Sequence, residues 1–120
     1  FGGYPLASVV GTYAIKVLID ENLAENAKKQ GNYLMGHLNS IKDEFPDKIK
    51  EVRGKGLLTA FEMHNEKHLD GHIVSVELLN HGVYAKETHY TTVRLAPALT
   101  INKNQIDLLS EAIRSVVKGL

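Results

Sequence analysis

The chain has 120 residues, 43% of them hydrophobic and 23% charged, which suits one soluble globular domain with a modest core. Its 14 basic and 14 acidic residues balance, so the charge gives no reason to expect binding to nucleic acid or to an anionic membrane. The absence of cysteine excludes disulfides and thiolate chemistry and fits a reducing compartment. No apolar run approaches the length of a membrane span, and no signal-peptide pattern opens the chain.

The first helix is predicted over residues 5–19. Pro5 suits the first helical position, where its missing N–H would be unpaired in any case. Seven apolar residues then recur at steps of three and four: Leu6, Val9, Val10, Tyr13, Ala14, Val17 and Leu18. Because the opposite face carries Ala7, Gly11 and Ile15, we expect this helix to need partners on most of its sides.

A second helix is predicted to follow at once. Asn22 and Glu25 have the spacing of a capping box, and Pro46 is expected to end the helix because the residue before a proline avoids the helical region. Gly31 and Gly36 interrupt its apolar stripe and are expected to allow close packing of backbones.

The remaining residues predict strands and helices in alternation. Strands are expected at 49–53 and 57–63, with Gly54-Lys55-Gly56 as the turn between them. A helix is then outlined by Leu69, Ile73, Val76 and Leu79 and closed by Gly82. It is followed by a strand at 83–85, a polar loop at 86–91 and a strand around Arg94. The last helix is capped by Asn102 and Gln105. The order α-α-β-β-α-β-β-α indicates an α/β sandwich (α+β type), with helices packed on a small, largely antiparallel sheet.

Two patterns that suggest ligand sites have more ordinary explanations. His64, His68 and His72 fall four residues apart, a spacing that can bind zinc from one helix face. No cysteine is available as a further ligand and Gly71 weakens that helix, so we interpret them as surface histidines and predict no metal site. The Gly54-Lys55-Gly56 turn lacks the third glycine and the Gly-Lys-[Ser/Thr] of nucleotide-binding loops.

Arg94 is the leading candidate for a binding residue. Its guanidinium offers a rigid fork of donors that matches a carboxylate through two bonds, although an arginine on a strand is more often only a solvated residue. Lys86 belongs to a residue type that forms Schiff bases with carbonyl compounds, but its loop is polar and offers no sign of such a role.

The stretch from Thr92 to Ile101 resembles the Arg-Phe-x-Pro-Pro-Leu motif near the C-terminus of class III aminotransferases, which depend on pyridoxal phosphate. Residues 1–7 look like the family's Thr-[Phe/Tyr]-Gly-Gly-Asn-Pro-Leu segment without its threonine, residues 21–27 resemble the stretch after it, and residues 52–58 are similar to its Val-Arg-Gly-[Lys/Arg]-Gly-Leu turn. Residues 82–89, with their Lys-x-Thr-His run, look more like the ornithine branch than the acetylornithine branch.

The resemblance implies the smaller C-terminal domain of a fold-type I aminotransferase. Residues 1–20 would be a helix linking from a large domain, and residues 21–120 would form the small domain. The family's cofactor lysine lies upstream of this segment, so we expect no catalytic residue here, no bound pyridoxal phosphate and no activity of the chain alone. The chain is thus expected to be part of a longer transaminase of the cytoplasm, or of the mitochondrial matrix if the source is eukaryotic.

The resemblance also implies site residues and partners. Arg94 would bind the substrate carboxylate, and Gly2 and Gly3 would lie near the cofactor phosphate of the neighbouring subunit of a homodimer. The substrates would be an amino acid, with ornithine as the expected donor, and a 2-oxo acid such as 2-oxoglutarate. Tyr4 stands where the family has Asn, which puts the phosphate side in question, and Ala98 replaces the second Pro of the motif, which should loosen the loop after Arg94.

Two other functions stay open at this stage. One is action of the parent protein on acetylornithine or another class III substrate, and the other is a stand-alone binding module without catalysis. In either case the apolar helix at 5–19 predicts that the isolated chain self-associates through residues 1–20.

Overall fold

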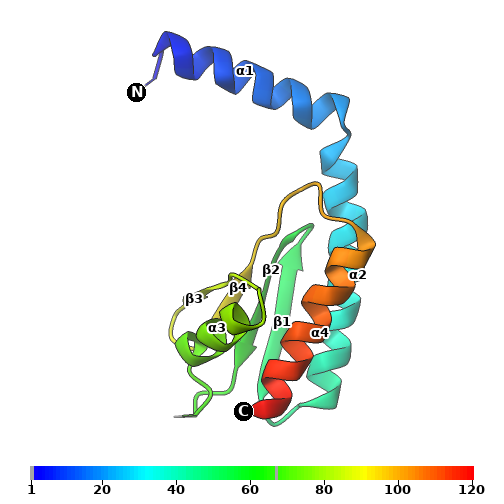
Figure 1. Ribbon diagram of the computed structural model, residues 1–120, viewed down its shortest axis with the longest axis vertical. Coiled ribbons are helices and arrows are strands. Elements are labelled where there is room, and N and C mark those ends of the chain that lie inside the picture. The colour runs from blue at the N-terminus through cyan, green and yellow to red at the C-terminus, as the bar shows by residue number, and fades with distance from the viewer. Residues whose placement is uncertain (1, 67) are drawn as a thin grey trace.

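The computed structural model describes residues 2–66 and 68–120, so Phe1 of the segment 1–7 lies outside the described residues. Eight elements follow one another: α1 (Pro5–Asp20), α2 (Leu23–Glu44), β1 (Ile49–Lys55), β2 (Leu58–Met63), α3 (Gly71–Asn80), β3 (Lys86–Thr88), β4 (Thr92–Leu95) and α4 (Lys103–Gly119). The strands form one antiparallel sheet in the order β1-β2-β4-β3 (Figure 1). The predicted order of elements and the α/β class are both confirmed.

The core lies between one face of this sheet and the helices α2, α3 and α4. Phe61 and Val93 come from the central strands, Leu38 from α2 and Ile113 from α4, and all four are fully buried. Burial of these side chains supplies the main driving force for folding. The opposite face of the sheet carries mainly polar and charged side chains, with Leu58 as an exposed apolar exception.

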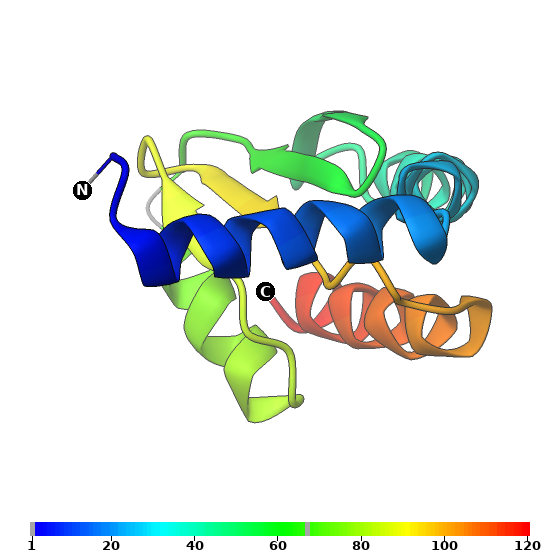
Figure 2. The same ribbon diagram turned by 90° about the horizontal axis from the view of Figure 1, so that it is seen from above.

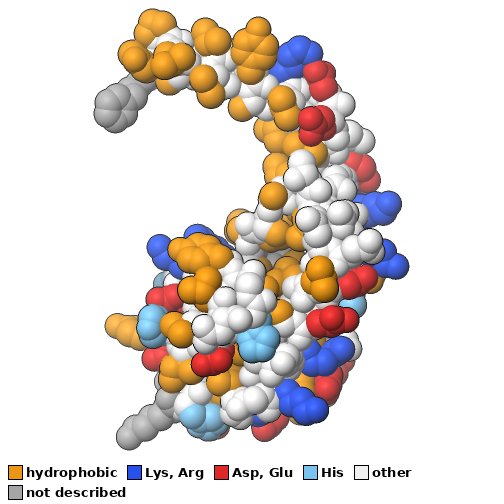
Figure 3. Space-filling model, in the orientation of Figure 1, with side chains coloured by type: hydrophobic (Ala, Val, Ile, Leu, Met, Phe, Trp, Pro, Cys, Tyr) orange, Lys and Arg blue, Asp and Glu red, His pale blue; other side chains and the backbone are white. Residues whose placement is uncertain are grey.

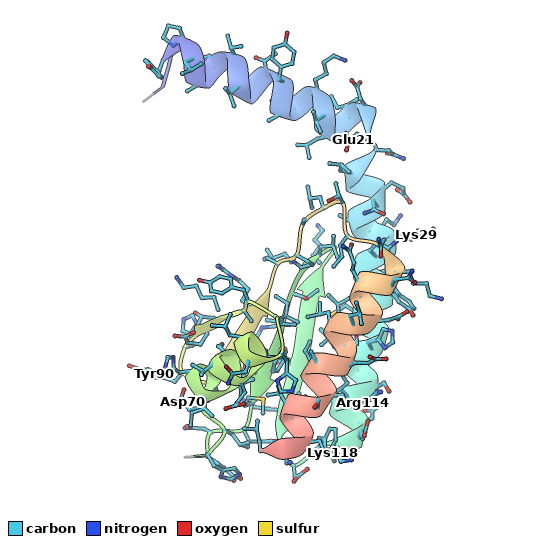
Figure 4. The ribbon with its side chains drawn as sticks, viewed as in Figure 1. Glu21, Lys29, Asp70, Tyr90, Arg114 and Lys118 are labelled. Carbon is cyan, nitrogen blue, oxygen red and sulfur yellow. The ribbon has the colours of Figure 1, made fainter. Side chains whose placement is uncertain are left out.

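The helix ends follow local chemistry, with one correction. Asn102 and Gln105 form the predicted capping box, each side chain bonding the other's backbone N–H at 3.0 Å. The predicted capping box at Asn22 is wrong, because Asn22 adopts the left-handed conformation (φ 52°, ψ 43°) and makes no side-chain cap. It occupies the sharp bend between α1 and α2, beside Glu21 (Figure 4), and asparagine tolerates that conformation better than most residues.

The region of α3 and β3 differs from the prediction in two ways. The helix begins at Gly71, after the Asp70 cap, and buries Val74 and Leu78, so Leu69 precedes it and the predicted residues Ile73, Val76 and Leu79 are exposed. The strand lies at Lys86–Thr88 and not at 83–85, because the N–H of Val83 bonds the carbonyl of Leu78 at 2.9 Å and so serves to close α3. Gly82 has φ +78° and ends α3 as predicted.

The two glycines of α2 have different surroundings. A Cβ added at Gly31 would lie 2.1 Å from the carbonyl oxygen of Gly56, whereas a Cβ at Gly36 would meet nothing within 4 Å. The expectation of close backbone packing is therefore confirmed for Gly31 and wrong for Gly36. Contact between Gly31 and Gly56 fixes the β1–β2 turn against α2.

Helix α1 extends away from the rest of the molecule. It buries none of its residues, and Leu6, Tyr13 and Ile19 are each more than half exposed. Figure 2 shows it crossing above the sheet and α4, and Figure 3 shows the hollow that it leaves beneath it. The radius of gyration is 16.4 Å, whereas a compact chain of this length has about 13–14 Å. Helix α1 therefore presents an uncovered apolar surface.

The glycine contact predicts opposite effects for two matched substitutions. Gly31→Ala should lower the free energy of unfolding by about 2–4 kcal/mol, because the new methyl group collides with backbone that cannot move freely. Gly36→Ala, in the same helix, should raise it by roughly 0.5–1 kcal/mol through helix propensity. Urea unfolding of the two variants measures both effects, and equal effects of the two substitutions would contradict the packing described.

Candidate functional site

The strand β4 places Arg94 on the sheet face away from the core. Val93 and Leu95 on either side of it are buried, while Arg94 is exposed. Because successive side chains of a strand point to opposite faces, burial of these two neighbours fixes the outward direction of Arg94. The helical side of the sheet is thus closed to Arg94, and the open face is where it can bind a ligand.

Strand register places Arg94 in a row of cations. Arg53 of β1 pairs with Ala60 of β2, Ala60 pairs with Arg94, and Arg94 pairs with Lys86 of β3. Directly paired residues in antiparallel strands share a face. The open face therefore carries, from one edge to the other, Arg53, Ala60, Arg94 and Lys86.

The neighbouring row holds the acidic groups, and they already have partners. Glu62 accepts from Arg53 Nη1 and from Lys50 Nζ, each at 2.8 Å. Arg53 Nη1 also lies 3.5 Å from Glu51 Oε2. The hydrogen bond from Lys50, then that from Arg53, lowers the pKa of the Glu62 carboxyl below its ordinary value, and Glu62 in turn raises the pKa of both bases.

Arg94 has no corresponding acidic partner. Within residues 2–66 and 68–120, no Asp or Glu oxygen lies within ion-pair distance of its guanidinium. Its donors are thus open on the solvent side of the sheet. A planar carboxylate is the ligand that best matches a free guanidinium.

A contact that the sequence did not reveal holds the loop after β4. Asn26 of α2 donates from its Nδ2 to the carbonyl oxygens of Leu99 at 2.6 Å and Ile101 at 3.1 Å. These bonds fix the loop that follows Arg94 against the start of α2. No sequence signal identifies Asn26, since it lies more than 70 residues away and its side chain resembles any polar residue on a helix.

Gly2 and Gly3 are not brought close to Arg94. They form a turn before α1, with φ +80° at Gly3, and α1 carries them across the hollow from the sheet (Figures 1 and 3). Both glycines are exposed, and a Cβ added at either would meet nothing within 4 Å. Their backbone is therefore open to another molecule, but the chain does not itself combine them with Arg94 in one site.

The described residues do not fit a complete pyridoxal phosphate site. A lysine that forms a Schiff base is commonly activated by burial, and none of the lysines in the described part of the chain is buried. Lys86 is exposed on the edge strand β3. None of the described lysines thus has the buried surroundings that commonly activate a Schiff-base lysine, and we assign this chain no step of the cofactor's chemistry.

The three histidines do not share a helix face. His64 follows β2 and its Nε2 lies 3.0 Å from the carbonyl oxygen of Pro46, whereas His72 belongs to α3 and its Nδ1 lies 3.4 Å from Glu87. Among the described residues no group of three or more His, Asp or Glu is arranged to hold a metal ion.

The helices in that same part of the chain are all too short or too polar to cross a membrane.

A cavity lies on the helical side of the sheet, away from the face that carries Arg94. It has a volume of about 470 Å³ and is lined by the end of α3, the residues after β4 and the first half of α4, including Tyr84, Pro97 and Leu108. Arg94 does not line it. This mainly apolar cavity is therefore separate from the candidate carboxylate site.

The comparison with known families defines the class of protein. Residues 1–117 match the family described as aminotransferase class III, and the chain belongs to that family. The expectation drawn from the motif around Arg94 is thereby confirmed.

Particular relatives point to the ornithine branch. The chain is 40% identical over 120 residues to a protein named ornithine aminotransferase, mitochondrial, from Oryza sativa, covering 98% of this chain and 25% of the relative. An ornithine delta-aminotransferase structure from Plasmodium falciparum matches with TM-score 0.83 and 39% identity, over 96% of this chain and 29% of that one. An acetylornithine aminotransferase structure from Elizabethkingia anophelis matches with TM-score 0.89 and 32% identity, over 97% and 30%. The chain thus spans about a quarter of the length of its curated relatives.

The Glu62 cluster predicts how stability depends on pH. A carboxyl whose pKa is lowered by folding stabilises the protein above its unfolded pKa, about 4.3 for glutamate, and this contribution disappears as the pH falls through the folded value. The free energy of unfolding should therefore decrease between neutral pH and the acid side of that range. Glu62→Gln should flatten this dependence because it removes the titrating group.

Arg53→Gln serves as the partner control, since it keeps the carboxyl but removes one of the bonds that lower its pKa. Its pH dependence should lie between those of the wild type and Glu62→Gln. Chemical unfolding at a series of pH values gives the three slopes, and three equal slopes would show that the cluster does not affect stability.

Proposed function

We propose that this chain is the carboxylate-binding C-terminal part of an aminotransferase that moves the side-chain amino group of ornithine to 2-oxoglutarate, giving glutamate semialdehyde and glutamate. The observation that carries the proposal is Arg94, which is held on a rigid strand, is open to solvent and has no acidic partner among the described residues. It stands in a chain that matches ornithine aminotransferases over nearly its whole length.

Arg94 would position the substrate. Its guanidinium can hold a carboxylate through two parallel N–H···O bonds, which fixes the orientation of the molecule as well as its place. Such positioning can lower the activation free energy of an enzyme reaction by several kcal/mol. The backbone around Arg94 favours this role because β2 and β3 bond β4 on both sides and Asn26 holds the loop that follows.

The remaining machinery would come from outside the segment. Pyridoxal phosphate, when bound in the parent protein, carries the amino group between the two half-reactions. We propose that its lysine lies upstream, that the chain alone transfers no amino groups, and that Gly2 and Gly3 approach the cofactor phosphate of the neighbouring subunit in a homodimer. The exposed backbone of both glycines supports this last assignment.

The same reasoning suggests a division at the bend between α1 and α2. We propose residues 1–20 as the link to a large domain and residues 21–120 as the small domain. This is supported by α1, which buries none of its own residues, and by the core, which is built from later elements. The expected compartment is the cytoplasm, or the mitochondrial matrix if the source is eukaryotic.

Two alternatives make different predictions. The first is a parent protein that uses acetylornithine or another class III donor, since an acetylornithine aminotransferase shares this fold with TM-score 0.89 and the fold alone does not select the donor. A stand-alone binding module would bind carboxylates without any dependence on pyridoxal phosphate. Single-turnover assays of the parent protein with ornithine and acetylornithine separate these possibilities from the proposed function.

Arg94→Lys in the parent enzyme tests the proposed role of the arginine. The substitution keeps the charge but removes the fork, so kcat/KM should fall roughly tenfold to a hundredfold, or about 1–3 kcal/mol of transition-state stabilisation. The loss should appear in the half-reaction whose substrate binds Arg94. Wild-type values in both half-reactions would remove Arg94 from the substrate site.

The isolated chain is predicted to self-associate through residues 1–20. Burial of the seven-residue stripe on α1 is worth on the order of 10 kcal/mol as an upper estimate, and a 16-residue helix is only marginally stable alone in water. In a solution of the pure chain, a second copy is the partner that can bury the apolar stripe of α1. Light scattering at micromolar concentration should therefore show a species larger than a monomer.

Two substitutions on α1 separate a specific contact from general stickiness. Val10→Lys places a charge within the stripe and should weaken the association, whereas Ser8→Lys places it outside the stripe and should have a smaller effect. A clean monomer of the unmodified chain, with α1 docked on its own sheet or helices, would contradict this prediction.

A further inference from the structure

Lys86 lies directly across from Arg94 on the edge of the sheet. The two residues are register partners in the antiparallel pair β3–β4, and both are exposed. Side chains in such a pair stand on the same face with their Cβ atoms about 5 Å apart. Figure 3 shows basic side chains (blue) gathered beside this edge, below the hollow under α1.

Two cations at this separation repel each other, and the nearby acids form their ion pairs with other bases. Like charges directly opposite on neighbouring strands are destabilising. The acids of the same face, Glu51 and Glu62, are engaged with Arg53 and Lys50. Glu87, beside Lys86 in the chain, is the register partner of Val93, whose side chain faces the core. Its Oε1 lies 3.4 Å from Nδ1 of His72.

The arrangement is therefore one of positive charge held open to solvent on a rigid strand pair. Neither Lys86 nor Arg94 forms an ion pair with an acidic side chain in the described part of the chain. An anionic ligand removes the repulsion, and a ligand with two negative charges removes more of it than a ligand with one. Ala60, on the other side of Arg94, is small and leaves the approach from β2 open.

We propose that Lys86 determines specificity at Arg94 by selecting the charge of the bound acid. Arg94 would hold one carboxylate through its fork, and Lys86 would add attraction for each further negative charge. The site then prefers dicarboxylic over monocarboxylic 2-oxo acids. The inference rests on the proposed role of Arg94 and adds the selecting residue.

The test is a titration of the chain with 2-oxoglutarate, which carries two negative charges, and with pyruvate, which carries one. Binding is measured from the NMR chemical shifts of the backbone amides of β3 and β4. At low ionic strength, Lys86→Gln should weaken 2-oxoglutarate binding about tenfold and pyruvate binding about threefold, as expected for a charge roughly 6 Å away in water. The preference for the dicarboxylate should therefore fall about threefold. Added salt should reduce the difference between wild type and variant.

Three further variants make the result specific. Lys86→Arg keeps the charge and should keep the preference. Lys55→Gln removes an exposed lysine from the opposite edge strand, on the same face, and should leave the preference unchanged. Thermal unfolding of each variant checks that the sheet is intact.

Arg94→Gln distinguishes failure of this inference from failure of the proposed function. If Arg94→Gln abolishes binding of both acids while Lys86→Gln leaves their ratio unchanged, Lys86 is not the selecting residue and Arg94 remains the carboxylate site. If Arg94→Gln alters neither titration, both assignments are wrong. A fall in the ratio for Lys86→Gln, restored in Lys86→Arg, supports the inference.

Discussion

The alternation of side chains between the two faces of the sheet along β4 is the constraint that fixes the position of Arg94. Val93 and Leu95 are required in the core, so Arg94 between them must face the open side of the sheet. A slip of one residue would bury a guanidinium and expose two apolar side chains, and both changes are costly. The apolar packing beneath the sheet therefore also holds Arg94 in place, and the pairing with β2 and β3 sets which charges stand beside it.

Charge on the open face is arranged in two rows with different roles. The row of Glu51, Glu62 and Thr92 holds Arg53 in bonds within the protein. The row that continues through Arg94 to Lys86 has no such acid, although the two rows are neighbours on the same strands. Residues of one type thus differ in function according to register: Arg53 stabilises the sheet, and Arg94 is open to a ligand.

The sequence predicted the features that depend on local pattern. The element order, the capping box at Asn102, the terminating Gly82 and the strand of Arg94 all follow from periodicity and turn chemistry. Features that depend on distant pairing were not predictable in this way. Examples are the bonds from Asn26 to the loop after β4, the bond of 2.6 Å from Tyr33 Oη to Asp107, which joins α2 to α4, and β3 itself, which is a strand because β4 lies beside it.

The central claim is that this chain supplies the carboxylate-binding part of an ornithine aminotransferase. The most direct measurement replaces the matching segment of the Plasmodium falciparum enzyme, whose structure gives the boundaries, with this chain and follows turnover of ornithine and 2-oxoglutarate. The account predicts a folded chimera that binds pyridoxal phosphate and is active, and that loses activity on Arg94→Gln. A chimera that folds and binds the cofactor but is equally active with and without Arg94 would contradict it.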